Sequence, residues 1–182
     1  MPRSNHAKSR RTKKSHRPIW LLLLLPLLGC ATTMPPGADS FSDYGWRAVK
    51  VETVRLRVPV GYETRRHDNL TLFFPAGTTD GLPWIGIATL PVAPEMITAD
   101  QLLERLQPAP SDEETNVRPA EALIAGVAVR GWQTRKDGVR GWTYVLRRGT
   151  RPRGLLLIAV PLAWADDRAW AFHDTVVAGV TY

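Results

Sequence analysis

Apolar and polar side chains alternate along several short segments of this chain, a pattern typical of strands that bury one face. Between residues 51 and 60, Val54, Leu56 and Val58 fall on one face, and the residues between them are arginines. We therefore expect a half-buried strand over residues 51–60.

Three further segments are apolar along most of their length. Residues 70–75 predict a short strand, whereas residues 84–90 and 155–161 are apolar on both faces. A strand without a polar face is covered on both sides. We therefore place the last two segments in the centre of a sheet.

Residues 122–136 and 139–148 predict a long hairpin, because Asp137-Gly138 between them is a strong signal for a two-residue turn. Such a turn sets three facing pairs: Arg135 with Arg140, Trp132 with Thr143, and Gly131 with Tyr144. We expect Gly131 to leave room for the ring of Tyr144.

The two faces of this hairpin differ in composition. One face is assigned to the core and carries Val127, Val129, Trp142, Tyr144 and Leu146. The opposite face is assigned to solvent or to a partner and carries Arg130, Trp132, Thr134, Thr143 and Arg147.

A helix is predicted after residue 98, where Thr98 and Gln101 have the spacing of a capping box. Leu102, Leu103 and Leu106 then form its core face.

A second helix is predicted from Asp166 to Val180, with Asp166 or Asp167 as its N-cap. Its core stripe has helical spacing and comprises Ala169, Phe172, Val176 and Val180.

Strands outnumber helices in this pattern, and their connections are short. The sequence therefore predicts one α+β domain over residues 45–182, a mainly antiparallel sheet of about five to six strands flanked by two helices.

A basic segment and a short apolar segment precede this domain. The apolar segment, residues 19–28, is shorter than the ~20 residues that span a membrane, and its place after basic residues is typical of an export signal. Leu27-Leu28-Gly29-Cys30 resembles the lipobox of bacterial lipoproteins. The resemblance implies that residues 1–29 are a signal peptide and that Cys30, the only cysteine, is lipidated.

The residue after this cysteine is Ala31, which in lipoproteins implies transfer to the outer membrane, facing the periplasm. Residues 30–44 are small, polar and proline-containing, and we expect them to be a flexible tether.

Charge follows the same division of the chain. Seven of the 24 lysines and arginines, and none of the 17 acids, lie in residues 1–29, so the remaining chain has no net charge. Nucleic-acid binding needs a clustered positive footprint. We therefore expect no nucleic-acid partner.

The elements expected over residues 46–182 follow a recognisable order. A strand ends in a Pro-Gly-Tyr-type turn within residues 57–62, and an apolar strand, a capped helix, a glycine-containing hairpin and an amphipathic helix follow. This arrangement resembles PsbP-like domains, a fold found in small bacterial lipoproteins. The resemblance implies a central antiparallel sheet flanked by helices, in a domain that binds or scaffolds and has no catalytic residues to transfer.

Catalytic and metal chemistry find little support in the sequence. The histidines after the signal peptide are His67, expected in a polar loop, and His173, expected on the surface of a helix. Each is followed by an aspartate, and adjacent residues do not share a helical face. We predict no enzyme activity, no metal site and no cofactor.

Two features are candidates for partner binding. Arg147, Arg148, Arg151 and Arg153 form a basic loop that is suited to anionic headgroups or an acidic protein, or that simply keeps a hairpin soluble. Trp132 beside Arg130 combines residue types enriched in interface hot spots, provided that no helix covers it.

These observations predict a lipid-anchored, non-enzymatic domain that binds an envelope partner. The alternative is a carrier or sensor that holds a small apolar or amphipathic ligand between sheet and helices.

Overall fold

The computed structural model describes residues 45–77, 81–90, 96–107 and 116–182. The elements of this described part are β1 (Trp46–Val51), β2 (Val54–Pro59), β3 (Tyr62–His67), β4 (Leu70–Pro75), β5 (Trp84–Ala88), α1 (Ala99–Leu106), β6 (Asn116–Ile124), β7 (Val127–Lys136), β8 (Val139–Arg148), β9 (Arg151–Pro161) and α2 (Asp166–Ala178). None of its helices has the length and apolar composition needed to cross a membrane.

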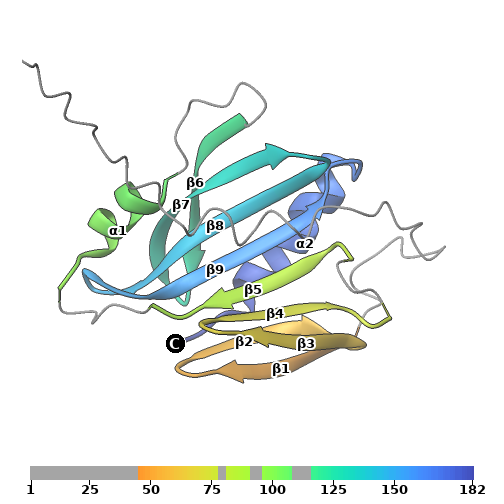
Figure 1. Ribbon diagram of the computed structural model, residues 1–182, viewed down its shortest axis with the longest axis horizontal. Helices are drawn as coiled ribbons and strands as arrows, with labels where there is room; N and C mark the ends of the chain where they lie inside the picture. Colours follow the sequence, from red (N-terminus) through yellow and green to blue (C-terminus); the bar gives the residue numbers. More distant parts are fainter. Residues whose placement is uncertain (1–44, 78–80, 91–95, 108–115) are drawn as a thin grey trace, which may run out of the picture.

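The strands form a two-stranded sheet, β1-β2, and a seven-stranded sheet of order β3-β4-β5-β9-β8-β7-β6 (Figure 1). All neighbouring strands are antiparallel. The larger sheet consists of two meanders, β3-β4-β5 and β6-β7-β8-β9, which are joined where β5 pairs with β9. The predicted α+β class is confirmed.

The described residues contain nine strands rather than the five to six expected. Two of the additional strands, β1 and β3, lie at the start of the domain. The segment 51–60 begins with a turn in which Glu52 has a φ of 52°, so β1 and β2 form a hairpin. β3 is exposed at five of its six positions and therefore lacks apolar alternation. His67 ends this strand, so its assignment to a loop was wrong.

The expected strand over residues 122–136 is also divided. Ala125 and Gly126 form a turn with φ values of 51° and 77°, and β6 and β7 pair on either side of it. β6 therefore begins at Asn116, earlier than the apolar pattern indicated.

The register predicted around Asp137-Gly138 is confirmed for all three facing pairs. The reason given for Gly131 was wrong, however. A Cβ at this position would lie 1.8 Å from the carbonyl oxygen of Thr143 and 2.9 Å from the Cα of Tyr144. Gly131 therefore makes room for the backbone of β8 rather than for an aromatic ring.

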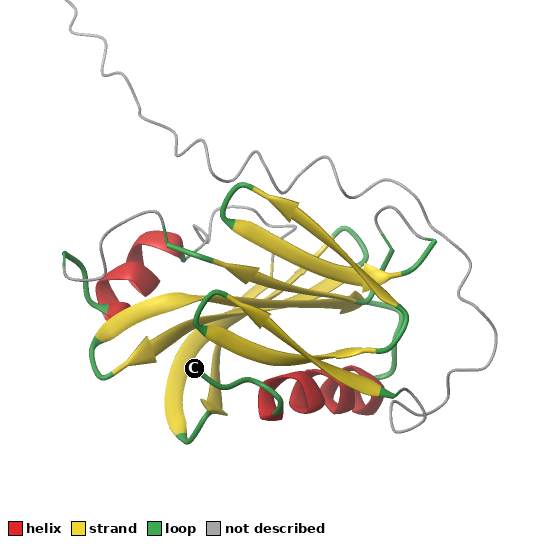
Figure 2. Ribbon diagram, turned by 90° about the horizontal axis from the view of Figure 1, so that it is seen from below, coloured by secondary structure: helices red, strands yellow, loops and turns green. Residues whose placement is uncertain are grey.

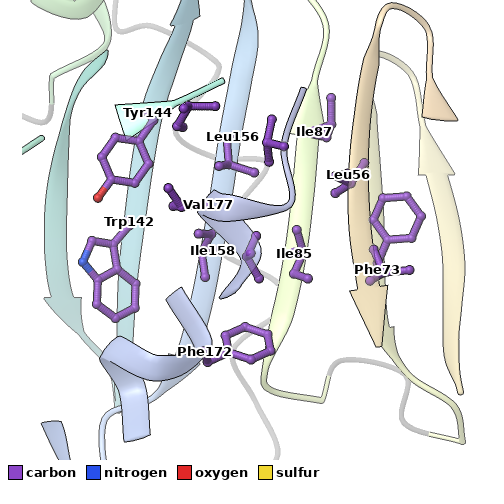
Figure 3. Close-up of a cluster of buried hydrophobic side chains, with 14 of the residues drawn as sticks. Leu56, Phe73, Ile85, Ile87, Trp142, Tyr144, Leu156, Ile158, Phe172 and Val177 are labelled. Atoms are coloured by element: carbon purple, nitrogen blue, oxygen red, sulfur yellow. The ribbon is translucent and has the colours of Figure 1, made fainter. Parts of the chain in front are cut away.

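One side of the seven-stranded sheet, the inner face, packs against α2 and the β1-β2 hairpin. Figure 3 shows Leu56 of β2 opposite Phe73 and the isoleucines of β5, with Phe172 of α2 at the lower end of the same cluster. The five residues assigned to the core face of the β7–β8 hairpin lie here, and all but Val127 are buried.

The two helices lie on different sides of this sheet (Figure 2). α1 has the predicted capping box, with backbone N–H groups of Thr98 and Gln101 donating to each other's side chains. Its three core-face leucines are only partly buried.

The predicted stripe is buried as expected, but α2 ends at Ala178, so Val180 lies beyond the helix rather than in it. The predicted cap is wrong, because Ala165 is the N-cap and makes no side-chain hydrogen bond. Asp166 is instead the first helical residue, and its carboxylate accepts from Arg140.

Candidate functional site

Arg147, Arg148, Arg151 and Arg153 lie on paired strand ends rather than in a loop. Arg148 and Arg151 face each other across the two-residue turn between β8 and β9, and both are exposed. Within the described residues, neither has an ion-pair partner. Their charges are therefore available to a partner.

Arg130 lies at the same end of the sheet. Arg147 donates from Nε to the carbonyl oxygen of Ala128, 3.1 Å away on β7, two residues before Arg130. Arg130 itself pairs with Asp100 of α1, which is fastened to the β8–β9 turn by a backbone hydrogen bond of 2.9 Å. We call this cluster the basic end; it comprises Arg130, Arg147, Arg148, Arg151 and Arg153.

The space between α1 and the sheet is small. A cavity of about 10 Å³ lies there, lined by Ala99, Asp100, Leu103, Arg130, Val145 and Arg147. This volume holds about one water molecule, whereas ligand sites usually measure about 300–1,000 Å³.

A larger, open hollow of about 450 Å³ lies beside the β1-β2 turn, lined by Lys50, Glu52, Thr53, Arg55, Thr181 and Tyr182. All six residues have charged or hydroxyl-bearing side chains, and four of them come from β1, β2 or the turn between these strands. The hollow therefore differs from the apolar sheet–helix site that a carrier of an apolar ligand was expected to have.

Trp132 is not an exposed anchor residue. It lies on the outer face, the side of the seven-stranded sheet opposite α2, and its side chain is only 8% exposed. Phe74, Val145 and Ala159 are buried on this face as well. The sequence left open whether Trp132 is covered, and the structure buries it because the sheet buries part of both faces.

The outer face nevertheless presents a continuous row of mostly apolar residues. The facing residues of this row are Leu72, Gly86, Leu157, Thr143, Trp132 and Pro119, one from each of six neighbouring strands. A Cβ on Gly86 would lie 3.1 Å from Leu72 Cδ2 and 3.4 Å from Leu157 Cδ1, so both leucines lean over Gly86. Both are half-buried and reach solvent.

The inner face contains a buried series of hydrogen bonds that we did not predict from the sequence. His173 is 3% exposed, with Nε2 2.7 Å from the Tyr144 hydroxyl and Nδ1 2.8 Å from Asp174 Oδ1. Its assignment to the surface was therefore wrong. His173 lies four residues after Ala169, a stripe residue, and this helical spacing was the available signal.

Burial keeps His173 and Tyr144 neutral. Burial lowers the pKa of His173, although the nearby Asp174 acts in the opposite direction. Burial also raises the pKa of the Tyr144 hydroxyl. Neutral His173 can donate from Nδ1 to Asp174 and accept at Nε2 from Tyr144, so both ring nitrogens are satisfied.

We expect this histidine to make stability depend on pH. Its folded pKa is below the value of about 6.5 typical of unfolded chains, so the unfolded state binds the proton more readily. The stabilising contribution is therefore present above pH ~6.5 and is lost as pH falls below that value. Urea unfolding at pH 7.5 and 5.5 should show a larger loss of stability for the wild type than for His173→Gln.

The exposed His67 provides the control for this experiment. His67→Gln should retain the pH dependence of the wild type. An equal dependence in His173→Gln and the wild type would contradict the assignment.

The hydrogen bonds from Tyr144 to His173 and Asp174 do not form a site for nucleophilic catalysis. Tyr144 is fully buried, and its hydroxyl keeps its proton under ordinary conditions. No group of three or more candidate metal ligands occurs among the described residues. Cys30 and the proposed signal peptide lie outside those residues.

The comparisons with known proteins concern the fold. No family model and no curated protein matches this sequence. Among solved structures, the solution structure of cyanobacterial PsbP (CyanoP) from Synechocystis sp. PCC 6803 is similar, with a TM-score of 0.50 and 10% sequence identity. The match covers 81% of this chain and 97% of that chain. The domain therefore has a PsbP-like α+β fold.

Proposed function

We propose that this protein is a non-enzymatic binding domain that docks an acidic envelope partner at its basic end and is held at the outer membrane by a lipid on Cys30. The observation that carries the proposal is the pair Arg148 and Arg151, exposed and without an ion-pair partner among the described residues. A PsbP-like fold, which the sequence resemblance associates with binding and scaffolding, is in keeping with it.

The position of these arginines favours recognition of a partner over a role in folding. A two-residue turn holds their backbone at fixed strand ends, so little backbone entropy is lost when a partner binds. Exposed like charges that face each other across a ladder destabilise a strand pair. An acidic surface that binds there relieves this repulsion and speeds association.

The lipid anchor rests on the sequence. The lipobox, its basic and apolar flanks and the single cysteine support lipidation at Cys30. When bacteria that express the protein are grown in medium containing labelled palmitate, the wild-type protein should become labelled. A Cys30→Ser variant that is still labelled would contradict the proposed anchor.

The carrier alternative has weaker support in the described residues. The cavity between α1 and the sheet, at about 10 Å³, does not accommodate an apolar ligand. The inner face is filled by the side chains of α2 and the β1-β2 hairpin. Binding of a partner at the surface is therefore the function we favour.

Charge reversal tests the docking surface directly. Arg148→Glu combined with Arg151→Glu should reduce the partner recovered by cross-linking and affinity capture from native membranes by at least about tenfold, since two favourable charge contacts become repulsive. Folding should be unaffected, because both side chains are exposed.

Lys50→Glu combined with Arg118→Glu is the matched control. Both residues are exposed and lie on β1 and β6, outside the basic end. This control makes the same change in net charge and should capture the partner as the wild type does. Equal loss in both double variants would indicate an effect of net charge and would rule out a specific basic end.

A further inference from the structure

Two arginines face each other on the inner face, at the Asp137-Gly138 end of the β7–β8 hairpin. Arg135 and Arg140 are direct register partners. Directly facing residues on antiparallel strands have Cβ atoms about 4.5–5.5 Å apart, and like charges there destabilise the pair. Arg140 is only 3% exposed, so solvent screens this repulsion weakly.

Several donors in this region lack an acceptor. Arg140 donates from Nη2 to Asp166 Oδ1 at 2.5 Å. Its Nε and Nη1, the Nε of Arg135 and the Nε1 of Trp142 are buried and have no hydrogen-bond partner among the described residues. A buried donor left without an acceptor destabilises the folded state. All four atoms are hydrogen-bond donors, so this region has more buried donors than acceptors.

The first turn of α2 also favours a negatively charged acceptor in this region. Arg140 contacts its first residue, Asp166, and the N-cap Ala165 makes no side-chain hydrogen bond. The free N–H groups and the dipole at a helix N-terminus favour negative charge. The unpartnered nitrogens of a buried arginine therefore lie beside a helix end that attracts anions.

We propose that Arg135, Arg140 and the N-terminus of α2 bind one oxyanion, a carboxylate or a phosphate group. The two guanidinium groups carry two positive charges, of which Asp166 balances only one in the free protein. The planar guanidinium matches the paired oxygens of these groups. Asp167 does not compete directly, because its Oδ1 accepts from the backbone N–H of Arg168 at 2.8 Å.

Asp166 has a defined role in this site. Its side chain is 71% exposed, whereas that of Arg140 is 3% exposed. The carboxylate can therefore turn towards solvent while the guanidinium stays in place. Asp166 occupies one edge of Arg140 in the free protein and competes with the incoming oxyanion for it.

The test uses the full chain, labelled with ¹⁵N and purified in a non-ionic detergent. Sodium phosphate and sodium acetate are titrated separately, and sodium chloride at equal ionic strength serves as reference. The readout is the indole N–H resonance of Trp142, assigned from its loss in Trp142→Phe. Phosphate, acetate or both should shift this resonance to saturation, and chloride should not.

Two substitutions decide whether the binding occurs at this site. Arg135→Gln should weaken oxyanion binding by about tenfold, since it removes one charged contact. Asp166→Asn should strengthen it severalfold, since it removes the competing carboxylate. Arg118→Gln, an exposed change on the neighbouring strand β6, should leave the affinity unchanged.

Three results would overturn the proposal. The first is a shift that grows linearly and equally with all three salts, which reports ionic strength alone. The second is unchanged affinity in Arg135→Gln. The third is weaker binding in Asp166→Asn, because Asp166 would then be part of the binding site rather than its competitor.

Discussion

Gly131→Ala should destabilise the domain by about 3 kcal/mol or more, the upper range for overpacking in a core. The added Cβ would lie 1.8 Å from the backbone carbonyl oxygen of Thr143 and 2.8 Å from its carbon. A backbone atom in the middle of a sheet has no rotamer to change. β8 would have to move away from β7, and Tyr144, the register partner of Gly131, would move with it.

Gly141→Ala is the matched control, a glycine-to-alanine change in the same hairpin. Its Cβ would meet the Oγ1 of Thr134 at 3.0 Å, and this atom belongs to a side chain that can rotate. We expect a cost below about 1 kcal/mol. Urea unfolding followed by tryptophan fluorescence measures both variants. Similar costs for the two would show that the approach of β7 to β8 is not the reason for glycine at residue 131.

Phe172→Ala should cost about 3–5 kcal/mol, the range for removing a large buried aromatic side chain. Phe172 is fully buried in α2. Its ring centroid lies 6.2 Å from that of Trp46 on β1 and 6.0 Å from that of Trp164, the latter edge-on. The substitution therefore loosens the β1-β2 hairpin as well as the helix.

Trp170→Ala tests whether burial explains this cost. Trp170 lies on the same helix and also contacts aromatic rings, Trp142 at 5.4 Å among them, but it is 42% exposed. We expect the smaller cost, about 1–2 kcal/mol, because a half-exposed side chain leaves a smaller cavity. Thermal unfolding of both variants makes the comparison. A larger loss for Trp170→Ala would contradict the position of Phe172 at the centre of the core.

The elements that could be predicted were those set by local chemistry. Asp137-Gly138 fixed a turn of two residues, and every facing pair of the β7–β8 hairpin follows from it. Thr98 and Gln101 were close enough in sequence to identify the start of α1. The buried stripe of α2 followed from helical spacing alone.

Other elements depend on contacts that the apolar pattern of the segment itself does not reveal. β3 has exposed side chains from Glu63 to His67, so its strand conformation comes from pairing with β4 rather than from burial. Trp132 shares its face with arginine and threonine, as a solvent-exposed residue would. Only the assembled outer face reveals that it is buried.

The candidate sites show the same limit. The arginines of the basic end could be listed from the sequence, and the pairing of Arg135 with Arg140 followed from the turn. Neither the proximity of α2 to Arg140 nor that of His173 to Tyr144 could be predicted. Both contacts join a helix to a strand, and no local pattern fixes how a helix lies across a sheet.

The seam between β5 and β9 has a consequence for how the chain folds. Each of the two meanders forms from strands that follow one another in sequence, but their junction closes a loop that contains α1 and three strands. Closing a long loop loses chain entropy before any contact forms, which makes such pairing slow. Until the seam closes, two apolar strands have bare edges, and in that interval the chain is most exposed to aggregation with its own copies.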